Sequence, residues 1–225
     1  MIQQLTFDLP GQNALGRSDF FVSPSNEAAV QALEDWQTWP SGKLILVGPE
    51  GSGKSHLTKV WADLASATLY DIAQKLGLIK GNVAVDGLDA IVGDPTHEEA
   101  LFHLHNHALA MGNQLLITSR QEPALMKFAL PDLQSRMMGT QLVRIAPPDE
   151  MLLSAVMAKL FDDRQVNISP TVVAYAVTRI DRTLAAVHAL VAALDDLSLV
   201  RAKPISRQMV AEILDQAEED RDDLS

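Results

Sequence analysis

The sequence predicts an α/β fold, in which a parallel sheet with helices on both faces is followed by a small all-helical domain. Strand-like apolar runs alternate with helix-like stretches through the first two thirds of the 225 residues, and this alternation is typical of parallel sheets. Pro147 and Pro148 then end the alternation, because proline donates no backbone hydrogen bond and restricts the residue before it. The rest of the sequence has helical patterning.

The sheet and its helices are predicted from the period and length of the apolar runs. Short apolar runs predict strands at 44–47, 68–71, 82–86, 114–119 and 141–145. Longer stretches of helical character predict helices that include 27–39, 54–66 and 97–111. The order of these elements is that of a sheet whose crossover connections are helices.

The helical domain is predicted from residues that cap helices. Asp149 can accept backbone hydrogen bonds at the start of a helix, and Ser169 followed by Pro170 has the form of a second start. Ser206 can cap a last helix that reaches about residue 217. Between the second start and the last helix, apolar residues recur at helical spacing, at Leu184, Val187, Leu190, Val191 and Leu194.

Composition limits the classes of function. A formal net charge of −11 disfavours a protein that coats DNA, because neutralising phosphates needs clustered lysine and arginine. Six acidic residues fall from Asp215 onward, in a stretch expected to be frayed and solvated. The absence of cysteine excludes disulfides and thiolate metal sites, and it suits the cytoplasm. Neither a signal peptide nor an apolar stretch that could span a membrane is visible, so we expect a cytoplasmic protein with no membrane partner.

A phosphate-binding loop follows the first predicted strand. Residues 48–55, GPEGSGKS, fit the pattern G-x-x-x-x-G-K-[ST]. Gly48, Gly51 and Gly53 would let backbone N–H groups approach phosphates, and Lys54 would place its ammonium on them. The Ser55 hydroxyl would ligate Mg²⁺. The flanking strand and helix make an accidental match the weaker alternative, and the sequence therefore predicts a nucleotide site for ADP or ATP with Mg²⁺.

Asp86 ends the predicted strand 82–86, and its carboxylate is suited to hold Mg²⁺ through water opposite Ser55. A plain aspartate at a strand end is the alternative. Gly87 follows it and offers no side chain to polarise an attacking water, so we expect intrinsic hydrolysis to be weak. Asp89 could take that role only if the turn after the strand redirected it.

Three segments together resemble the AAA+ ATPases of the bacterial replication initiator DnaA. They are GKSHL at 53–57, LITS at 116–119 and LQSR at 133–136, which look like that group's phosphate-binding loop, sensor 1 and arginine-finger box. The resemblance covers about residues 18 to 217 and implies an AAA+ nucleotide-binding domain over 13–147 and a helical lid over 148–225.

The resemblance also implies roles for individual residues. Thr118, or else Ser119, would be the sensor 1 hydroxyl. Arg136 would be an arginine finger that acts in trans on a neighbouring subunit's ATP, against the alternative of a surface arginine in an ion pair. Arg182 would be the lid arginine called sensor 2, for which Arg179 is the nearby competitor.

The chain stops after the predicted lid, as in the truncated members of this group that regulate DnaA. Those members bind the DNA polymerase sliding clamp through a short N-terminal motif, and Gln4, Leu5, Phe7 and Leu9 within residues 1–12 look like one. A disordered leader or a short edge strand is the alternative for this segment.

This resemblance implies a regulator of chromosome replication initiation that binds the sliding clamp and stimulates hydrolysis of DnaA-bound ATP. An autonomous AAA+ ATPase such as a helicase loader is one alternative, and a non-catalytic adaptor between DnaA and the clamp is another. We expect no strong direct DNA binding, and the sequence leaves a homo-oligomer open.

The histidines of residues 97–111 raise the possibility of a metal site. His103 and His107 would share a helix face, while His105 would point away from it. The neighbouring Glu98 and Glu99 are expected to be solvated, so a metal site is disfavoured.

Overall fold

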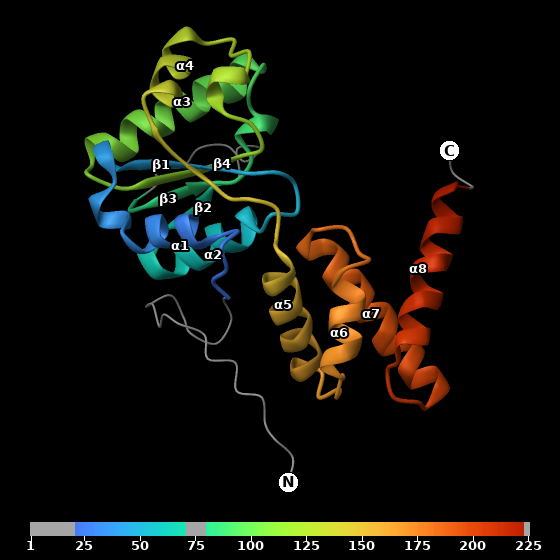
Figure 1. Cartoon of the computed structure of the whole chain (residues 1–225). Coiled ribbons are helices and arrows are strands. Elements are labelled where there is room, and N and C mark those ends of the chain that lie inside the picture. The colour runs from blue at the N-terminus through green and yellow to red at the C-terminus, as the bar shows by residue number, and fades with distance from the viewer. Residues whose placement is uncertain (1–20, 71–79, 223–225) are drawn as a thin grey trace.

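The computed structural model describes the backbone of residues 21–70 and 80–222 and the side chains of these ranges up to residue 217. Five parallel strands form one sheet in the order β2-β3-β4-β1-β5 (Figure 1). Their bounds are β1 Lys43–Val47, β2 Thr68–Tyr70, β3 Val83–Val85, β4 Leu115–Ser119 and β5 Gln141–Arg144. Each predicted strand is confirmed to within one residue at either end.

Helices cover both faces of the sheet, as Figure 1 shows. The helices are α1 Glu27–Glu34, α2 Lys54–Ala65, α3 Pro95–Ala110 and α4 Pro131–Met138. Strand β1 is buried along its whole length and sends alternate side chains to opposite faces. Leu44 and Leu46 join the core beneath α1 and α2, whereas Ile45 and Val47 join the core beneath α3 and α4. The predicted α/β class is confirmed.

The helix predicted over 27–39 is too long. Helix α1 ends at Glu34, and two 3₁₀ turns, Trp36–Thr38 and Pro40–Gly42, follow it. Trp39 is extended because it precedes Pro40. Its ring stacks on Trp61 at 5.1 Å between centroids, and its indole N–H donates to the Ala32 carbonyl at 2.7 Å. Packing of this indole therefore competes with continuation of the helix.

Four further helices pack around a core of their own beside the sheet (Figure 1). They are α5 Glu150–Asp163, α6 Pro170–Val177, α7 Leu184–Arg201 and α8 Arg207–Asp222. The predicted caps are present, because the Asp149 carboxylate accepts from Leu152 N at 2.8 Å and the Ser169 hydroxyl accepts from Thr171 N at 3.3 Å. Helix α8 runs on to Asp222, so the described part of the acidic stretch that was expected to be frayed is helical.

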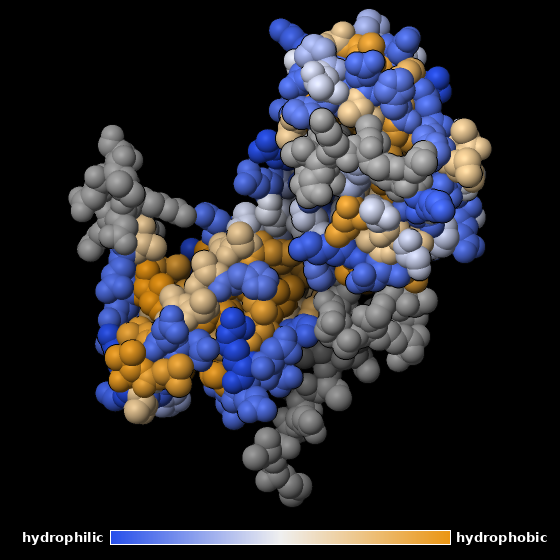
Figure 2. Space-filling view, turned by 180° about the vertical axis from the view of Figure 1, so that it is seen from behind, coloured by the Kyte–Doolittle hydropathy of each residue, from blue (hydrophilic) through white to orange (hydrophobic). Residues whose placement is uncertain are grey.

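The lid helices expose apolar surface. In Figure 2 hydrophobic residues gather over this part of the molecule, and the last turn of α7 contains Leu199 and Val200, which are 73% and 83% exposed. Among the residues that the structure describes, no helix is both long enough and apolar enough to cross a membrane.

Candidate functional site

The loop between β1 and α2 is held tightly by its neighbours. A Cβ atom at Gly48 would lie 2.3 Å from Ile145 Cγ2 and 2.6 Å from the Ile145 carbonyl oxygen, so only glycine fits there. Gly48 N donates to the Ser119 carbonyl at 3.0 Å, which joins the loop to the end of β4. Gly51 and Gly53 have φ of +73° and +96°, in the left-handed region that favours glycine. Glycine is thus required at position 48 by close packing and favoured at positions 51 and 53 by the backbone conformation.

The lid packs directly on this loop. Leu184 N, at the start of α7, donates to the Gly51 carbonyl at 3.2 Å. A Cβ atom at Gly51 would lie 2.5 Å from Thr183 Cβ, so the absence of a side chain there lets the lid approach. The sequence analysis missed this contact, because no local pattern pairs residues so far apart in the chain.

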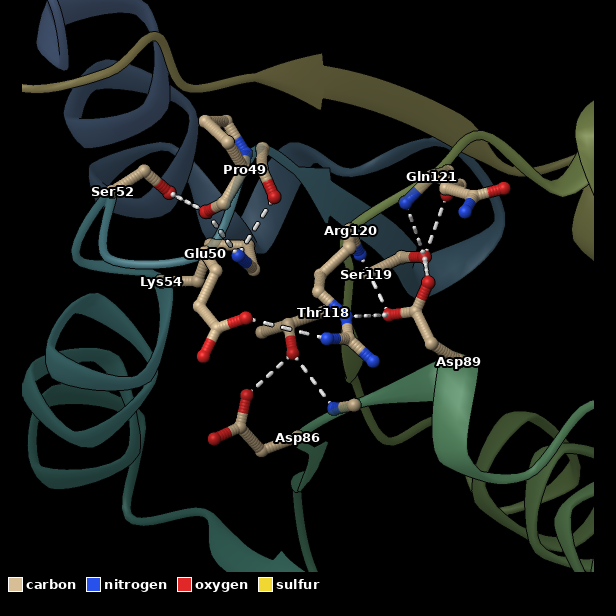
Figure 3. Close-up of polar contacts among 12 residues, drawn as sticks. Pro49, Glu50, Ser52, Lys54, Asp86, Asp89, Thr118, Ser119, Arg120 and Gln121 are labelled. Atoms are coloured by element: carbon tan, nitrogen blue, oxygen red, sulfur yellow. Dashed lines mark hydrogen bonds and ion pairs between the residues drawn. The ribbon is translucent and has the colours of Figure 1, made fainter. Parts of the chain in front are cut away.

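Lys54 begins α2 and lies in the same loop (Figure 3). Its ammonium donates to the carbonyls of Gly48 at 2.7 Å and Pro49 at 2.8 Å. Burial lowers the pKa of Lys54, while the charges of Asp89 and Asp86 oppose that change. Lys54 lines the same cleft as Asp86 and Asp89, the two carboxylates that follow β3.

Asp86 and Thr118 meet across the ends of β3 and β4 (Figure 3). The Thr118 hydroxyl donates to Asp86 Oδ1 at 2.5 Å and accepts from Gly87 N at 2.8 Å. Because parallel strands end at the same edge of a sheet, the strand order brings these two predicted residues together. Thr118 is therefore the hydroxyl that orients Asp86, whereas the buried Ser119 hydroxyl donates to the Gln121 carbonyl at 2.6 Å.

The turn after β3 directs Asp89 back into the site. Gly87 has φ of +91° and starts the 3₁₀ turn Leu88–Ala90. One oxygen of Asp89 accepts from Arg120 N at 2.7 Å, and the other lies 3.4 Å from the Ser119 hydroxyl oxygen, whose proton is donated to the Gln121 carbonyl. The Arg120 side chain reaches Glu50 at 3.4 Å, which closes a polar network from β4 to the loop (Figure 3).

These residues line a cleft of about 900 Å³ between the sheet edge and the lid. Six predicted residues line it, namely Gly51, Gly53, Lys54, Ser55, Asp86 and Thr118. The opposite wall comes from Phe21 and from α5 and α7, with apolar Val156, Leu160 and Leu184 beside Lys159, Asp163 and His188. The α5 and α7 residues of this wall were not predicted from the sequence, since the side chains of a lid helix carry no motif.

The oxygen and nitrogen groups of the cleft fit a nucleotide with Mg²⁺. Lysine and backbone N–H groups at a helix start suit phosphates, and a hydroxyl with a nearby carboxylate suits Mg²⁺. Among the described residues, no group of three or more histidines and carboxylates could hold a metal ion on its own. A metal ion at Ser55 and Asp86 would therefore also need oxygens from phosphates or water.

Two of the predicted arginines lie outside the cleft, as far as the described residues define its lining. Arg182 is exposed, and its guanidinium pairs with Glu150 at 3.4 Å. Its competitor Arg179 stacks on the Tyr175 ring at 3.8 Å from the centroid. Arg136 is exposed on α4, with its guanidinium carbon 5.7 Å from the centre of the Phe102 ring. The segment with Gln4, Leu5, Phe7 and Leu9 lies outside the described residues.

The histidines of α3 do not converge. His105 is fully buried, whereas the side chain of His103 is 64% exposed. Glu98, expected to be solvated, is fully buried, and its carboxylate accepts three backbone N–H groups, from Gly93, Ala129 and Leu130. The expectation that Glu98 is solvated was wrong, because the hydrogen bonds from these three N–H groups compensate for the cost of burying its carboxylate.

Because His105 is buried, we expect the free energy of unfolding to depend on pH. Burial lowers the pKa of His105 from 6.5 to about 4, with a contrary contribution from its hydrogen bond to Asn106. The unfolded chain therefore binds this proton below pH 6.5, whereas the folded chain does not until about pH 4. This stabilisation is full above pH 6.5 and is lost as the pH falls to about 4. The free energy of unfolding is expected to fall by at most about 3 kcal/mol over this range.

Urea unfolding of the wild type and of His105→Asn between pH 4 and 7 measures this contribution. The difference between the two free energies of unfolding should narrow as the pH falls, because only the wild type loses the stabilisation. His103→Asn is the matched control on the same helix, and its difference from the wild type should be smaller. A difference for His105→Asn that is constant across this range would contradict the prediction.

No known protein-family profile matches the sequence. Solved structures do match its fold. Domain III of the replication initiation protein DnaA from Thermotoga maritima has a TM-score of 0.78 at 19% identity, over 88% of this chain and 94% of that one. AMPPCP-bound DnaA from Aquifex aeolicus has a TM-score of 0.65 at 18% identity, over 78% of this chain and 63% of that longer one.

A third match extends the comparison beyond DnaA. A single-substitution variant of RuvB from Thermotoga maritima has a TM-score of 0.67 at 16% identity, over 85% of this chain and 67% of that one. Identities this low establish the fold alone. The chain therefore has the AAA+ fold that DnaA domain III and RuvB share, with a five-stranded parallel sheet and a helical lid.

Proposed function

We propose that the chain is a regulatory inactivator of DnaA of the Hda type. In this role it binds ADP or ATP in its own cleft, binds the sliding clamp, and stimulates hydrolysis of DnaA-bound ATP. The chain has the fold of DnaA domain III, and the observation that carries the proposal is that its cleft residues and its candidate arginine finger lie apart in this fold. Lys54 and Asp86 line the cleft, whereas Arg136 is exposed on α4 and lies outside it.

Nucleotide binding is supported by the residues that meet in the cleft. In this proposal Lys54 exchanges the Gly48 and Pro49 carbonyls for phosphate oxygens, and the N–H groups at the start of α2 contact the same phosphates. Ser55 and Asp86 hold Mg²⁺, which neutralises phosphate charge when bound. Thr118 fixes Asp86 through their hydrogen bond. Solved DnaA with AMPPCP has the same fold and supports an adenine nucleotide as the ligand.

A role for Arg136 in trans is supported by its exposure. A guanidinium outside its own cleft can reach a phosphate only on another molecule, where it stabilises the charge that develops during phosphoryl transfer. Arg136 lies on the two-turn helix α4, which packs on α3 (Figure 1). DnaA domain III has the same fold, so we infer that DnaA is the partner whose nucleotide cleft lies against the face that exposes Arg136.

Clamp binding rests on the sequence of the N-terminal segment. Gln4, Leu5, Phe7 and Leu9 offer one amide and three spaced apolar side chains, which fit a pocket that takes a short extended peptide. In this role the segment tethers the chain to the clamp and raises its effective concentration near DnaA on DNA.

An autonomous ATPase is the second candidate, because Asp89 is directed into the cleft. However, one oxygen of Asp89 accepts from Arg120 N at 2.7 Å and lies 3.8 Å from Nε of the Arg120 guanidinium. A carboxylate committed in this way is poorly placed to polarise water. We therefore expect weak intrinsic turnover and favour the regulatory role.

Hydrolysis of DnaA-bound ATP with DNA-loaded clamp tests the proposal. Acceleration should need both the clamp and this protein, and a variant with Gln4, Leu5 and Phe7 replaced by alanine should lose most of it. Equal acceleration without the clamp would overturn the tether. A folded, clamp-bound protein that gives no acceleration would favour the adaptor role, and strong turnover by the chain alone would favour the autonomous ATPase.

A further inference from the structure

Lys43 is a buried lysine without a carboxylate partner in the described part of the chain. It begins β1, is 7% exposed, and its ammonium lies 3.1 Å from the Arg136 carbonyl and 3.4 Å from His105 Nε2. Lysine is seldom this buried unless it is paired, since removing an ammonium from water is costly. A neutral apolar residue would fill the site at lower cost, so stability alone does not account for Lys43.

The contact with Arg136 involves a carbonyl that the helix leaves free. Helix α4 has eight residues, and the last carbonyls of a helix have no partner within it. Two side chains supply hydrogen bonds to the Arg136 carbonyl, from Lys43 Nζ at 3.1 Å and from the Thr140 hydroxyl at 2.8 Å. A cation at the C-terminal end of a helix is also favourable for the helix dipole. Lys43 therefore caps α4 at the residue that carries the exposed guanidinium.

The other end of α4 is held from the same side. The Glu98 carboxylate accepts from Ala129 N at 2.9 Å and from Leu130 N at 2.6 Å, just before the helix begins at Pro131. A helix of two turns is only marginally stable by itself. Charged groups from β1 and α3 fix both of its ends, so the position of α4 is set by the core.

The charges in this cluster also act on the guanidinium. Burial and then the nearby charge of Arg136 lower the pKa of Lys43, as expected for an ammonium close to a second cation. His105 has its pKa lowered to about 4 by burial, so it is neutral at pH 7 and accepts the Lys43 N–H. Repulsion by the buried Lys43 ammonium favours an Arg136 guanidinium that points away from the core, where an anion of a partner can bind it.

We propose that Lys43 is a positioning residue for Arg136, holding the last turn of α4 so that the guanidinium is presented to the ATP of a partner in a fixed place. This inference rests on the proposed function. A shift of about 1 Å in a catalytic group can lower a rate by about 100-fold, so loss of one of two anchors is expected to cost about tenfold.

The test compares Lys43→Met with Lys59→Met, which removes the same charge from the exposed surface of α2. Lys43→Met should lower the maximal rate of stimulated hydrolysis of DnaA-bound ATP by about tenfold. The concentration for half-maximal stimulation and the affinity for ADP should not change. Hydrogen–deuterium exchange of the Gly139 and Thr140 amides should become faster, and Lys59→Met should match the wild type in every measurement.

A folded Lys43→Met with the wild-type maximal rate would overturn the role of Lys43 and leave the proposed function intact. A wild type that stimulates nothing would overturn the proposed function, and the role of Lys43 with it. If Lys43→Met fails to fold, Lys43→Gln replaces it. The glutamine amide still donates to a carbonyl but has no charge, so a rate between the wild-type value and about a tenth of it is expected, and a wild-type rate again overturns the role.

Discussion

Arg136→Ala is expected to lower the stimulated hydrolysis of DnaA-bound ATP by about 10³-fold or more, which is the range measured for arginine fingers. The guanidinium is always charged and donates two parallel hydrogen bonds, so it stabilises phosphoryl oxygens as their charge grows. Single-turnover hydrolysis of preloaded ATP on DnaA, with clamp on DNA, measures this rate. Binding of the variant to clamp and to ADP should be unchanged, because Arg136 is outside the described lining of the cleft.

Arg207→Ala is the matched control for this experiment. Arg207 is also exposed and also lies beside an aromatic ring, 5.8 Å from the centre of Tyr175, compared with 5.7 Å between Arg136 and Phe102. It should leave the stimulated rate at the wild-type value. Arg136→Lys should recover little, since an ammonium makes no bidentate contact. Full stimulation by a folded Arg136→Ala would exclude Arg136 as the finger.

Gly51→Ala is expected to weaken the binding of ADP by roughly 10- to 100-fold. Two effects combine at this position. The φ of +73° is unfavourable for alanine, and the new Cβ atom would lie 2.5 Å from Thr183 Cβ. The loop or the lid must move, so the wall formed by α7 leaves its place opposite the phosphates. Isothermal titration with ADP and Mg²⁺ measures the affinity.

Two further variants separate these effects. Gly112 has the same φ of +73° with no atom within 4 Å of its added Cβ, so Gly112→Ala should cost about 1 kcal/mol of stability and leave ADP binding unchanged. Thr183→Gly removes the two atoms that the new Cβ meets most closely, and glycine replaces threonine as a helix cap at a cost of a few tenths of a kcal/mol. The double variant should regain part of the lost affinity. No recovery would show that the lid contact is unimportant.

Local patterns predicted the sheet and part of the cleft. The strand ending in Asp86, the strand with Thr118 and the glycine-rich loop are each recognisable within a few residues, and the parallel order brings them together. Asp89 could not be placed in this way, because its direction depends on the φ of +91° at Gly87. The roles of Arg136 and Arg182, and the boundary after residue 147, stay predictions.

Long-range contacts were beyond the sequence. The fit of Thr183 against Gly51 joins residues that are far apart in the chain, and its only local sign is a glycine that the phosphate loop already explains. Glu98 has the same limitation. Its sequence neighbours are charged, yet its carboxylate is buried because the N–H groups of the nearby Gly93 and of the distant Ala129 and Leu130 need an acceptor.

Strand β1 gives the molecule a direction. At its start Lys43 contacts the helix that carries Arg136, and at its end Val47 leads into the nucleotide loop. The strand spans about 16 Å and is bonded on both sides, by β4 and β5, so it cannot slide. In the proposed role the molecule would offer Arg136 at one end of β1 and bind a nucleotide at the other end. Such a molecule would join a partner head to tail. If Arg136 acts in trans as proposed, only one order of two molecules with this fold places it at the partner's cleft, and the reverse order gives no stimulation.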